Sequence, residues 1–228
     1  MDTYISIELL FRWLHVLFGV TWIGLLYYFN FIQGEYFKEA EPGAKADATQ
    51  KLAPRALWWF RWGAMFTFLT GLYLLHAITS AGIDSYIIVG ALMGIFMFLN
   101  VWLIIWPNQK IVCGIVEGDA AAAAPKAMLA SRTNTLFSSM MLLGMLGSGH
   151  GSGDAANIVM SSNKALMKLA ETSGQGGMSM GLMIVLAIVV LLQLNAMFGK
   201  VGPMASVKGV IHCSIALTVA CLAILQFV

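Results

Sequence analysis

Residues 11–33 read FRWLHVLFGVTWIGLLYYFNFIQ, and this stretch decides the class of fold. An α-helix needs about 20 mostly apolar residues to cross a bilayer, so the stretch is long enough to span one. It also contains the polar residues Arg12, His15 and Asn30, whose presence is not explained by contact with lipid alone. Because ionisable residues inside a membrane are costly and usually functional, His15 is the first candidate for a functional residue.

The rest of the chain has the same membrane character. Of its 228 residues, 59% are hydrophobic and 11% are charged, whereas an average soluble domain contains roughly 25% charged residues. The formal net charge of +2 gives no indication of nucleic-acid binding. We therefore predict a single integral membrane domain over residues 1–228, of the all-α class, in contact with membrane lipid.

Apolar segments separated by polar stretches predict a polytopic membrane helix bundle with about six transmembrane helices and additional interfacial helices. Pro107 is expected to end the third span, because the residue before a proline is displaced from the α region. Residues 34–55 are expected to form a loop with one or two amphipathic turns, residues 108–130 an interfacial helix, and part of 149–177 a surface helix. The predicted spans are 6–33, 56–79, 86–107, 132–148, 178–198 and 206–227.

Basic residues are concentrated in the loops on one side of the predicted bundle. Loops 34–55, 108–131 and 199–205 hold most of the lysines and arginines outside the spans, and short loops of this kind face the cytoplasm. We therefore expect a multi-pass protein of a bacterial inner membrane with both termini in the periplasm. The acidic N-terminus and the long, aromatic first span argue against a cleavable signal peptide.

The cysteines and methionines do not indicate a redox metal site of their own. Cys113, Cys213 and Cys221 form neither a CxxC nor a CxxCH motif, so a disulfide framework and a covalently attached haem are not predicted. The 15 methionines are interpreted as packing residues, since no regular pattern with histidine indicates a copper path. Copper is therefore not expected as a cofactor.

The predicted topology places three histidines in the outer half of the membrane. Two neutral imidazoles on neighbouring helices at similar depth are what a b-type haem needs for axial ligation. His15 and His76 differ in expected depth by less than about 10 Å at 1.5 Å per residue, so they are the leading pair of ligands for the haem iron. His150 is the alternative second ligand, although its Gly- and Ser-rich surroundings also fit an interfacial residue.

A second set of polar residues shares one level in the inner half of the predicted bundle. Arginine suits bidentate binding of carboxylates and phosphates, and asparagine suits paired hydrogen bonds with a planar ring. A substrate or anion such as urate, a quinone head group or a lipid phosphate would fit this layer. Alternatively, the asparagines hold helices together and the arginines extend to the interface. The set consists of Asn30, Arg61, Asn100, Arg132, Asn134 and His212, with Gln193 and Asn195 at the same level.

Four motifs in order resemble the N-terminal membrane domain of the membrane-bound urate oxidase family. They read WLHVLFGVTWIGLLYYFNF, ALWWFRWGAMFT, NVWLIIWPNQK and SRTNTLFSSMM. Members with the full architecture carry a C-terminal cytochrome c domain, and they are held to oxidise urate and to pass electrons to a respiratory chain. No CxxCH motif occurs up to Val228, so we expect any electron acceptor to be another polypeptide. The first motif is also more distantly similar to the small membrane protoporphyrinogen oxidase family, which implies haem binding by His15.

These observations support two functions of different kinds. The first is a membrane redox protein of the urate oxidase N-terminal domain type, which binds haem b and passes electrons to a separate c-type cytochrome. The second is a non-catalytic accessory subunit of a larger respiratory or photosynthetic membrane complex. A transporter is disfavoured, because inverted repeats and broken helices would be expected. The residues alone do not decide whether the chain is an enzyme, although an oxidoreductase is the class that the first function would require.

Overall fold

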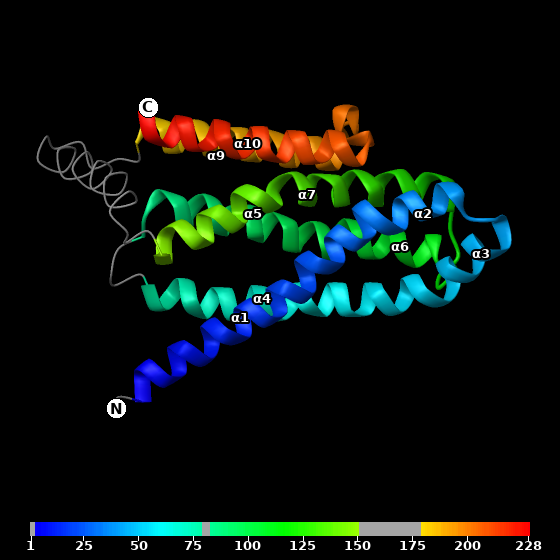
Figure 1. Cartoon of the computed structure of the whole chain (residues 1–228), viewed down its shortest axis with the longest axis horizontal. Coiled ribbons are helices and arrows are strands. Elements are labelled where there is room, and N and C mark those ends of the chain that lie inside the picture. The colour runs from blue at the N-terminus through cyan, green and yellow to red at the C-terminus, as the bar shows by residue number, and fades with distance from the viewer. Residues whose placement is uncertain (1–2, 79–82, 151–178) are drawn as a thin grey trace, which may run out of the picture.

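The computed structural model describes residues 3–78, 83–150 and 179–228. These ranges are almost entirely helical, and they contain no strand. The long helices run along one axis as an all-α bundle (Figure 1), which confirms the predicted fold class.

Several helical segments combine α-helices with π-helical turns. The first long segment consists of α1 (Thr3–Tyr27), η1 (Tyr28–Gln33) and α2 (Gly34–Glu39). The next consists of α3 (Pro42–Asp47), η2 (Ala48–Leu52) and α4 (Ala53–Ile78). The third consists of α5 (Ser85–Leu99), η4 (Asn100–Ile105) and α6 (Trp106–Val112). They are followed by α7 (Ala120–His150), α9 (Met180–Phe198), the 3-10 turn η5 (Gly202–Ala205) and α10 (Val207–Phe227).

The helix α1 begins, and α10 ends, at the same end of the bundle, which we call the terminal end (Figure 1). The opposite end, which we call the α3 end, carries α2, α3 and the end of α6. This arrangement agrees with two termini on one side of a membrane. The assignment of that side to the periplasm stays a prediction.

Four helical segments in the described ranges are long and apolar enough to cross a membrane. They are Ile7–Glu39, Ser85–Val112, Met180–Phe198 and Val207–Phe227, with mean hydropathy from 1.7 to 2.4. The chain is therefore a multi-pass membrane protein by length and composition. The helices α4 and α7 are of comparable length and run beside these segments, but they are not among the segments apolar enough to cross, so their crossing of the membrane stays a prediction.

Pro107 does not end the third helical segment, so the prediction that the span would end there is wrong. The helix continues through α6 to Val112. The π-helical turn η4 directly precedes α6 and places Pro107 in the first turn of that helix. A proline is tolerated there, because the N–H that it lacks would have no regular helical partner.

The polar stretches next to the spans are also more helical than expected. The predicted loop 34–55 is covered by α2, α3, η2 and the start of α4, with a break at residues 40–41. Ion pairs of Glu35 with Lys38 and of Asp47 with Lys51 lie one turn apart on exposed helix surface, where such pairs add modest helical stability.

The predicted interfacial helix over 108–130 and the span over 132–148 are divided differently in the structure. α6 takes the residues up to Val112, and α7 runs without interruption from Ala120 to His150. Asp119 Oδ1 accepts hydrogen bonds from the backbone N–H groups of Ala121 and Ala122, which is how an aspartate starts a helix. The surface helix expected within 149–177 lies, from residue 151 onward, outside the described residues.

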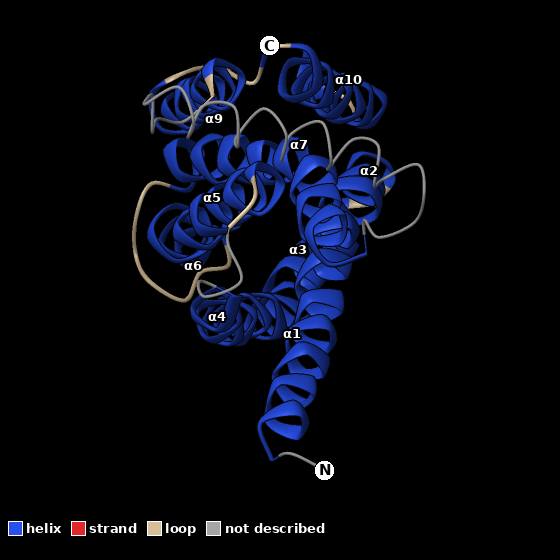
Figure 2. Cartoon of the chain, turned by 90° about the vertical axis from the view of Figure 1, so that its left-hand side faces the viewer, coloured by secondary structure: helices blue, strands red, loops and turns tan. Residues whose placement is uncertain are grey.

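The helix α7 occupies the centre of the bundle and packs against α1, α5, α6, α9 and α10. The pair α9–α10 lies on one side of α7, and α4 with the first part of α1 lies on the other (Figure 2). The helix α5 approaches α7 so closely that a Cβ on Gly144 would lie 2.6 Å from the carbonyl oxygen of Tyr86. Residues 132–138 of α7 are all buried. Polar side chains on this helix must therefore find their partners inside the protein.

Candidate functional site

His15 lies in the contact between α1 and α4. Its Nδ1 is 2.9 Å from the carbonyl oxygen of Thr67 and 3.1 Å from Oγ1 of Thr70. A carbonyl oxygen can only accept a hydrogen bond, so Nδ1 carries the proton and Nε2 has the unshared electron pair. Such a bond fixes the tautomer and the ring orientation, as it commonly does for metal-binding histidines.

The imidazole of His15 lies against a position of α4 that has no side chain. A Cβ on Gly71 would lie only 3.0 Å from Cε1 of His15. Aromatic contacts flank this position, since Phe11 stacks on Tyr73 with ring centroids 3.9 Å apart and Phe18 contacts Phe66 at 4.9 Å. The half-buried histidine is therefore held by both its hydrogen bonds and the shape of α4.

The structure places the other three histidines apart from this contact. His76 lies five residues beyond Gly71 and is exposed, which is about 7.5 Å along the helix at 1.5 Å per residue. His150 is the last residue of α7, and its side chain lies outside the described part of the structure. His212 is exposed near the start of α10, at the α3 end. No group of three or more His, Cys, Asp or Glu that could hold a metal ion occurs among the described residues.

Three amides from different helical segments bind one another in the buried interior. Nδ2 of Asn100 donates to Oδ1 of Asn134 at 2.8 Å and to Oε1 of Gln193 at 3.0 Å. Nε2 of Gln193 donates to Oδ1 of Asn100 at 2.7 Å, and Nδ2 of Asn134 donates to the carbonyl oxygen of Met97 at 2.9 Å. All three amides are buried. These hydrogen bonds join separate helices, which is one of the two roles expected for Asn100 and Asn134.

Asn30 also uses its amide within the protein. Its Nδ2 donates to the carbonyl oxygen of Leu26 at 2.9 Å and to Oγ of Ser131 at 2.8 Å. One turn away, the hydroxyl groups of Tyr27 and Ser138 are 2.9 Å apart. These bonds join the end of the first long helix to α7.

Arg61 and Arg132 differ from the asparagines, because each has a buried Nη1 without a hydrogen-bond partner among the described residues. The guanidinium of Arg61 lies 3.8 Å from the centroid of the Trp106 ring, a cation–π distance. Arg132 is only 6% exposed. Among the described side chains, neither arginine has a carboxylate oxygen within 4.0 Å.

Two tryptophans in the middle of their helical segments share this property. Among the described residues, the Nε1 atoms of Trp22 and Trp102 are buried without a hydrogen-bond partner. Oε1 of Gln33 is a buried acceptor that likewise has no partner there. Trp102 packs edge-on against Trp62, with ring centroids 5.6 Å apart. Reasoning from the sequence did not single out Trp22, Gln33 and Trp102. The two tryptophans could have been noticed, because they lie far from the ends of their spans, where tryptophan is usually found.

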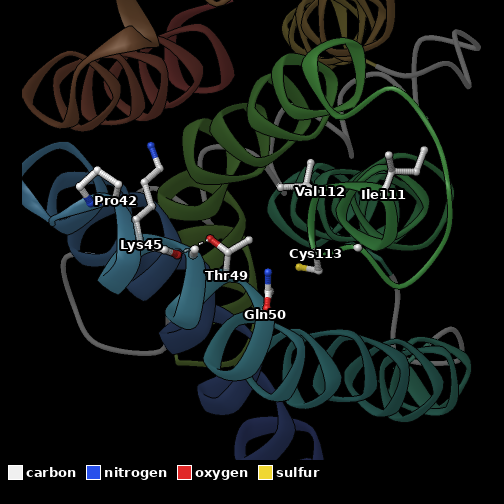
Figure 3. Close-up of a pocket in the computed structure, with 9 residues that line it drawn as sticks. Pro42, Lys45, Thr49, Gln50, Ile111, Val112 and Cys113 are labelled. Atoms are coloured by element: carbon white, nitrogen blue, oxygen red, sulfur yellow. Dashed lines mark hydrogen bonds between the residues drawn. The ribbon is translucent and has the colours of Figure 1, made fainter.

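A pocket of about 430 Å³ opens at the α3 end of the bundle (Figure 3). It lies between α3 with η2 on one side and the end of α6 on the other, and it contains no acidic side chain in its lining. Cys113 lines the pocket, and burial raises the pKa of its thiol. The complete lining consists of Pro42, Lys45, Ala46, Thr49, Gln50, Ile111, Val112, Cys113 and Gly114.

No family model, curated protein or solved structure matches this chain. The relationship to the urate oxidase membrane domain therefore stays a prediction from the four motifs.

Proposed function

We propose that this chain is a multi-pass membrane redox protein that holds a b-type haem with His15 as an axial ligand and passes electrons to a separate c-type cytochrome. The observation that supports this function is the 2.9 Å hydrogen bond between His15 Nδ1 and the carbonyl oxygen of Thr67. Histidines that bind metals almost always donate their second ring N–H to a carbonyl, a carboxylate or water. The bond leaves Nε2 as the nitrogen that would ligate iron.

The surroundings of His15 fit one axial bond to a haem. Thr67 and Thr70 orient the ring, and Gly71 leaves the space that the ring occupies. A haem bound here would supply one-electron redox chemistry. The described residues do not present a second imidazole at the same level, so His76 and His150 are proposed second ligands on the basis of the sequence alone.

An absorption spectrum of the purified protein, oxidised and then reduced with dithionite, tests this function. We expect a Soret band and, after reduction, an α band of the b type. His15→Ala should abolish both bands, because it removes the ligating nitrogen. His212→Ala is the matched control, since that histidine is exposed at the other end of the bundle. A folded protein that lacks a Soret band after expression with added haem precursor would exclude the proposed cofactor.

The second candidate, a non-catalytic accessory subunit, is favoured by a different observation. The amides of Asn100, Asn134 and Gln193 are used for helix association rather than for a ligand. In addition, α1 presents an apolar stripe in which Leu9, Val16 and Val20 are 66%, 63% and 68% exposed. Such a stripe fits lipid or a neighbouring subunit. Absence of the haem bands, together with migration in mild detergent as part of a complex that contains cytochromes, would support this candidate over the first.

A further inference from the structure

We propose that the side chains of Arg61, Trp102, Trp106 and Lys110, which we call the Arg61 cluster, form a binding site for a phosphate group. The site is distinct from His15 and does not depend on the haem proposal. Arg61 belongs to α4, whereas the other three residues belong to η4 and α6. Contact between Trp62 and Trp102, at 5.6 Å between ring centroids, holds these helices together beside the cluster.

The first observation is an accumulation of positive charge on one indole. The guanidinium carbon of Arg61 lies 3.8 Å from the centroid of the Trp106 ring, and Nζ of Lys110 lies 5.8 Å from it. Among the described residues, neither cation has a carboxylate oxygen within 4.0 Å. Each cation is therefore held by an aromatic ring rather than by an acidic partner, and an anion bound beside it would supply the missing opposite charge.

The second observation is a pair of buried donors without acceptors. Nη1 of Arg61 and Nε1 of Trp102 are both buried and have no hydrogen-bond partner in the part of the chain that the structure describes. An arginine that merely extended to the membrane surface would expose its nitrogens to water, but Nη1 of Arg61 is shielded from water. Unsatisfied buried donors are costly. A ligand with acceptor oxygens and negative charge supplies what such donors lack.

The position of the cluster identifies the kind of oxyanion. Trp106 and Lys110 lie in the last part of the span Ser85–Val112, within about 9 Å of its end at 1.5 Å per residue. This is the level at which lipid phosphates lie and at which Trp and Lys are enriched. At this level a phosphate could come from an anionic lipid head group or from the aqueous side of the interface.

Binding to the purified full-length chain in detergent tests the site. The probes are mixed micelles with phosphatidylglycerol, mixed micelles with phosphatidylcholine, and inorganic phosphate, and the readouts are tryptophan fluorescence and thermal stability. We expect saturable binding that Arg61→Gln weakens by about tenfold, because a charge-assisted hydrogen bond is lost. Arg55→Gln is the matched control, since Arg55 is exposed in the first turn of the same helix.

A lipid source is supported if phosphatidylglycerol binds and inorganic phosphate does not compete, and a soluble source is supported if inorganic phosphate alone produces the response. Trp102→Phe keeps an aromatic ring but removes the indole N–H, and it should weaken binding by about threefold. This variant decides the question if Arg61→Gln does not fold. Absence of saturable binding to any probe, or equal binding by the wild type, Arg61→Gln and Trp102→Phe, would overturn the proposal.

Discussion

Asn100 and Gln193 form a reciprocal pair of hydrogen bonds, in which each side-chain amide donates to the carbonyl oxygen of the other, at 3.0 and 2.7 Å. The two residues are 93 positions apart in the sequence, and their pair joins η4 to α9 in the buried interior. In an apolar environment an amide without a partner is costly, so the pair favours one position of α9 against the rest of the bundle.

Replacement of Asn100 by leucine should destabilise the protein, because it leaves the amide of Gln193 and Oδ1 of Asn134 without their partner. We expect the free energy of unfolding to fall by about 1–3 kcal/mol, measured by denaturation of the detergent-solubilised protein. Asn108→Leu is the control, since the amide of Asn108 donates, among the described residues, only to the carbonyl oxygen of Ile104 in its own segment. Equal losses for the two variants would contradict a special role of the amide network.

Gly71→Ala should disturb His15 directly. The new Cβ would lie 3.0 Å from Cε1 of the imidazole, so the ring must shift by a few tenths of an ångström while its hydrogen bonds to Thr67 and Thr70 restrain it. We expect a loss of about 1–3 kcal/mol in stability and, if the haem proposal is right, a weaker Soret band. Gly24→Ala is the matched control, because a Cβ there meets nothing within 4 Å and alanine is the better helix former. A stable Gly71→Ala protein with an unchanged spectrum would contradict the described packing of His15.

Cys113 should react slowly with alkylating reagents at neutral pH. Burial raises the pKa of its thiol, and only the thiolate is nucleophilic. The rate of modification by iodoacetamide should therefore continue to rise at pH values where an exposed cysteine already reacts at its maximal rate. The measurement uses a Cys213→Ala, Cys221→Ala background, with Glu117→Cys in a Cys113→Ser chain as the exposed reference. Identical pH profiles for the two thiols would show that Cys113 is not shielded.

Pro107→Ala should leave the stability almost unchanged, within about 0.5 kcal/mol. Pro107 lies in the first turn of α6 after the π-helical turn η4, where its missing N–H has no regular partner. By contrast, Ala64→Pro in the buried middle of α4 should cost about 3 kcal/mol or more, because it removes a helical hydrogen bond. Thermal unfolding followed by circular dichroism distinguishes these cases, and a large effect at Pro107 would mean that the proline shapes η4.

The helix boundaries show where reasoning from the sequence works and where it does not. The last two predicted spans, 178–198 and 206–227, agree closely with Met180–Phe198 and Val207–Phe227, because serine caps and continuous apolar runs define them locally. The end predicted at Pro107 is wrong, because the π-helical turn that accommodates this proline is a feature of the folded backbone. The polar stretch 34–55 is helical for a different, local reason, since charge pairs one turn apart support helices that are poor in apolar residues.

The sequence by itself determined that this is a helical membrane protein, because long apolar segments in lipid must satisfy their backbone hydrogen bonds within a helix. It also singled out His15 and the level of polar residues that includes Asn100 and Arg61. Only the tertiary structure decided which of these groups are satisfied. Asn100 binds partners 34 and 93 positions away, whereas Nη1 of Arg61 is buried without a partner. No local pattern encodes this difference, because it depends on which side chains meet when separate helices pack together.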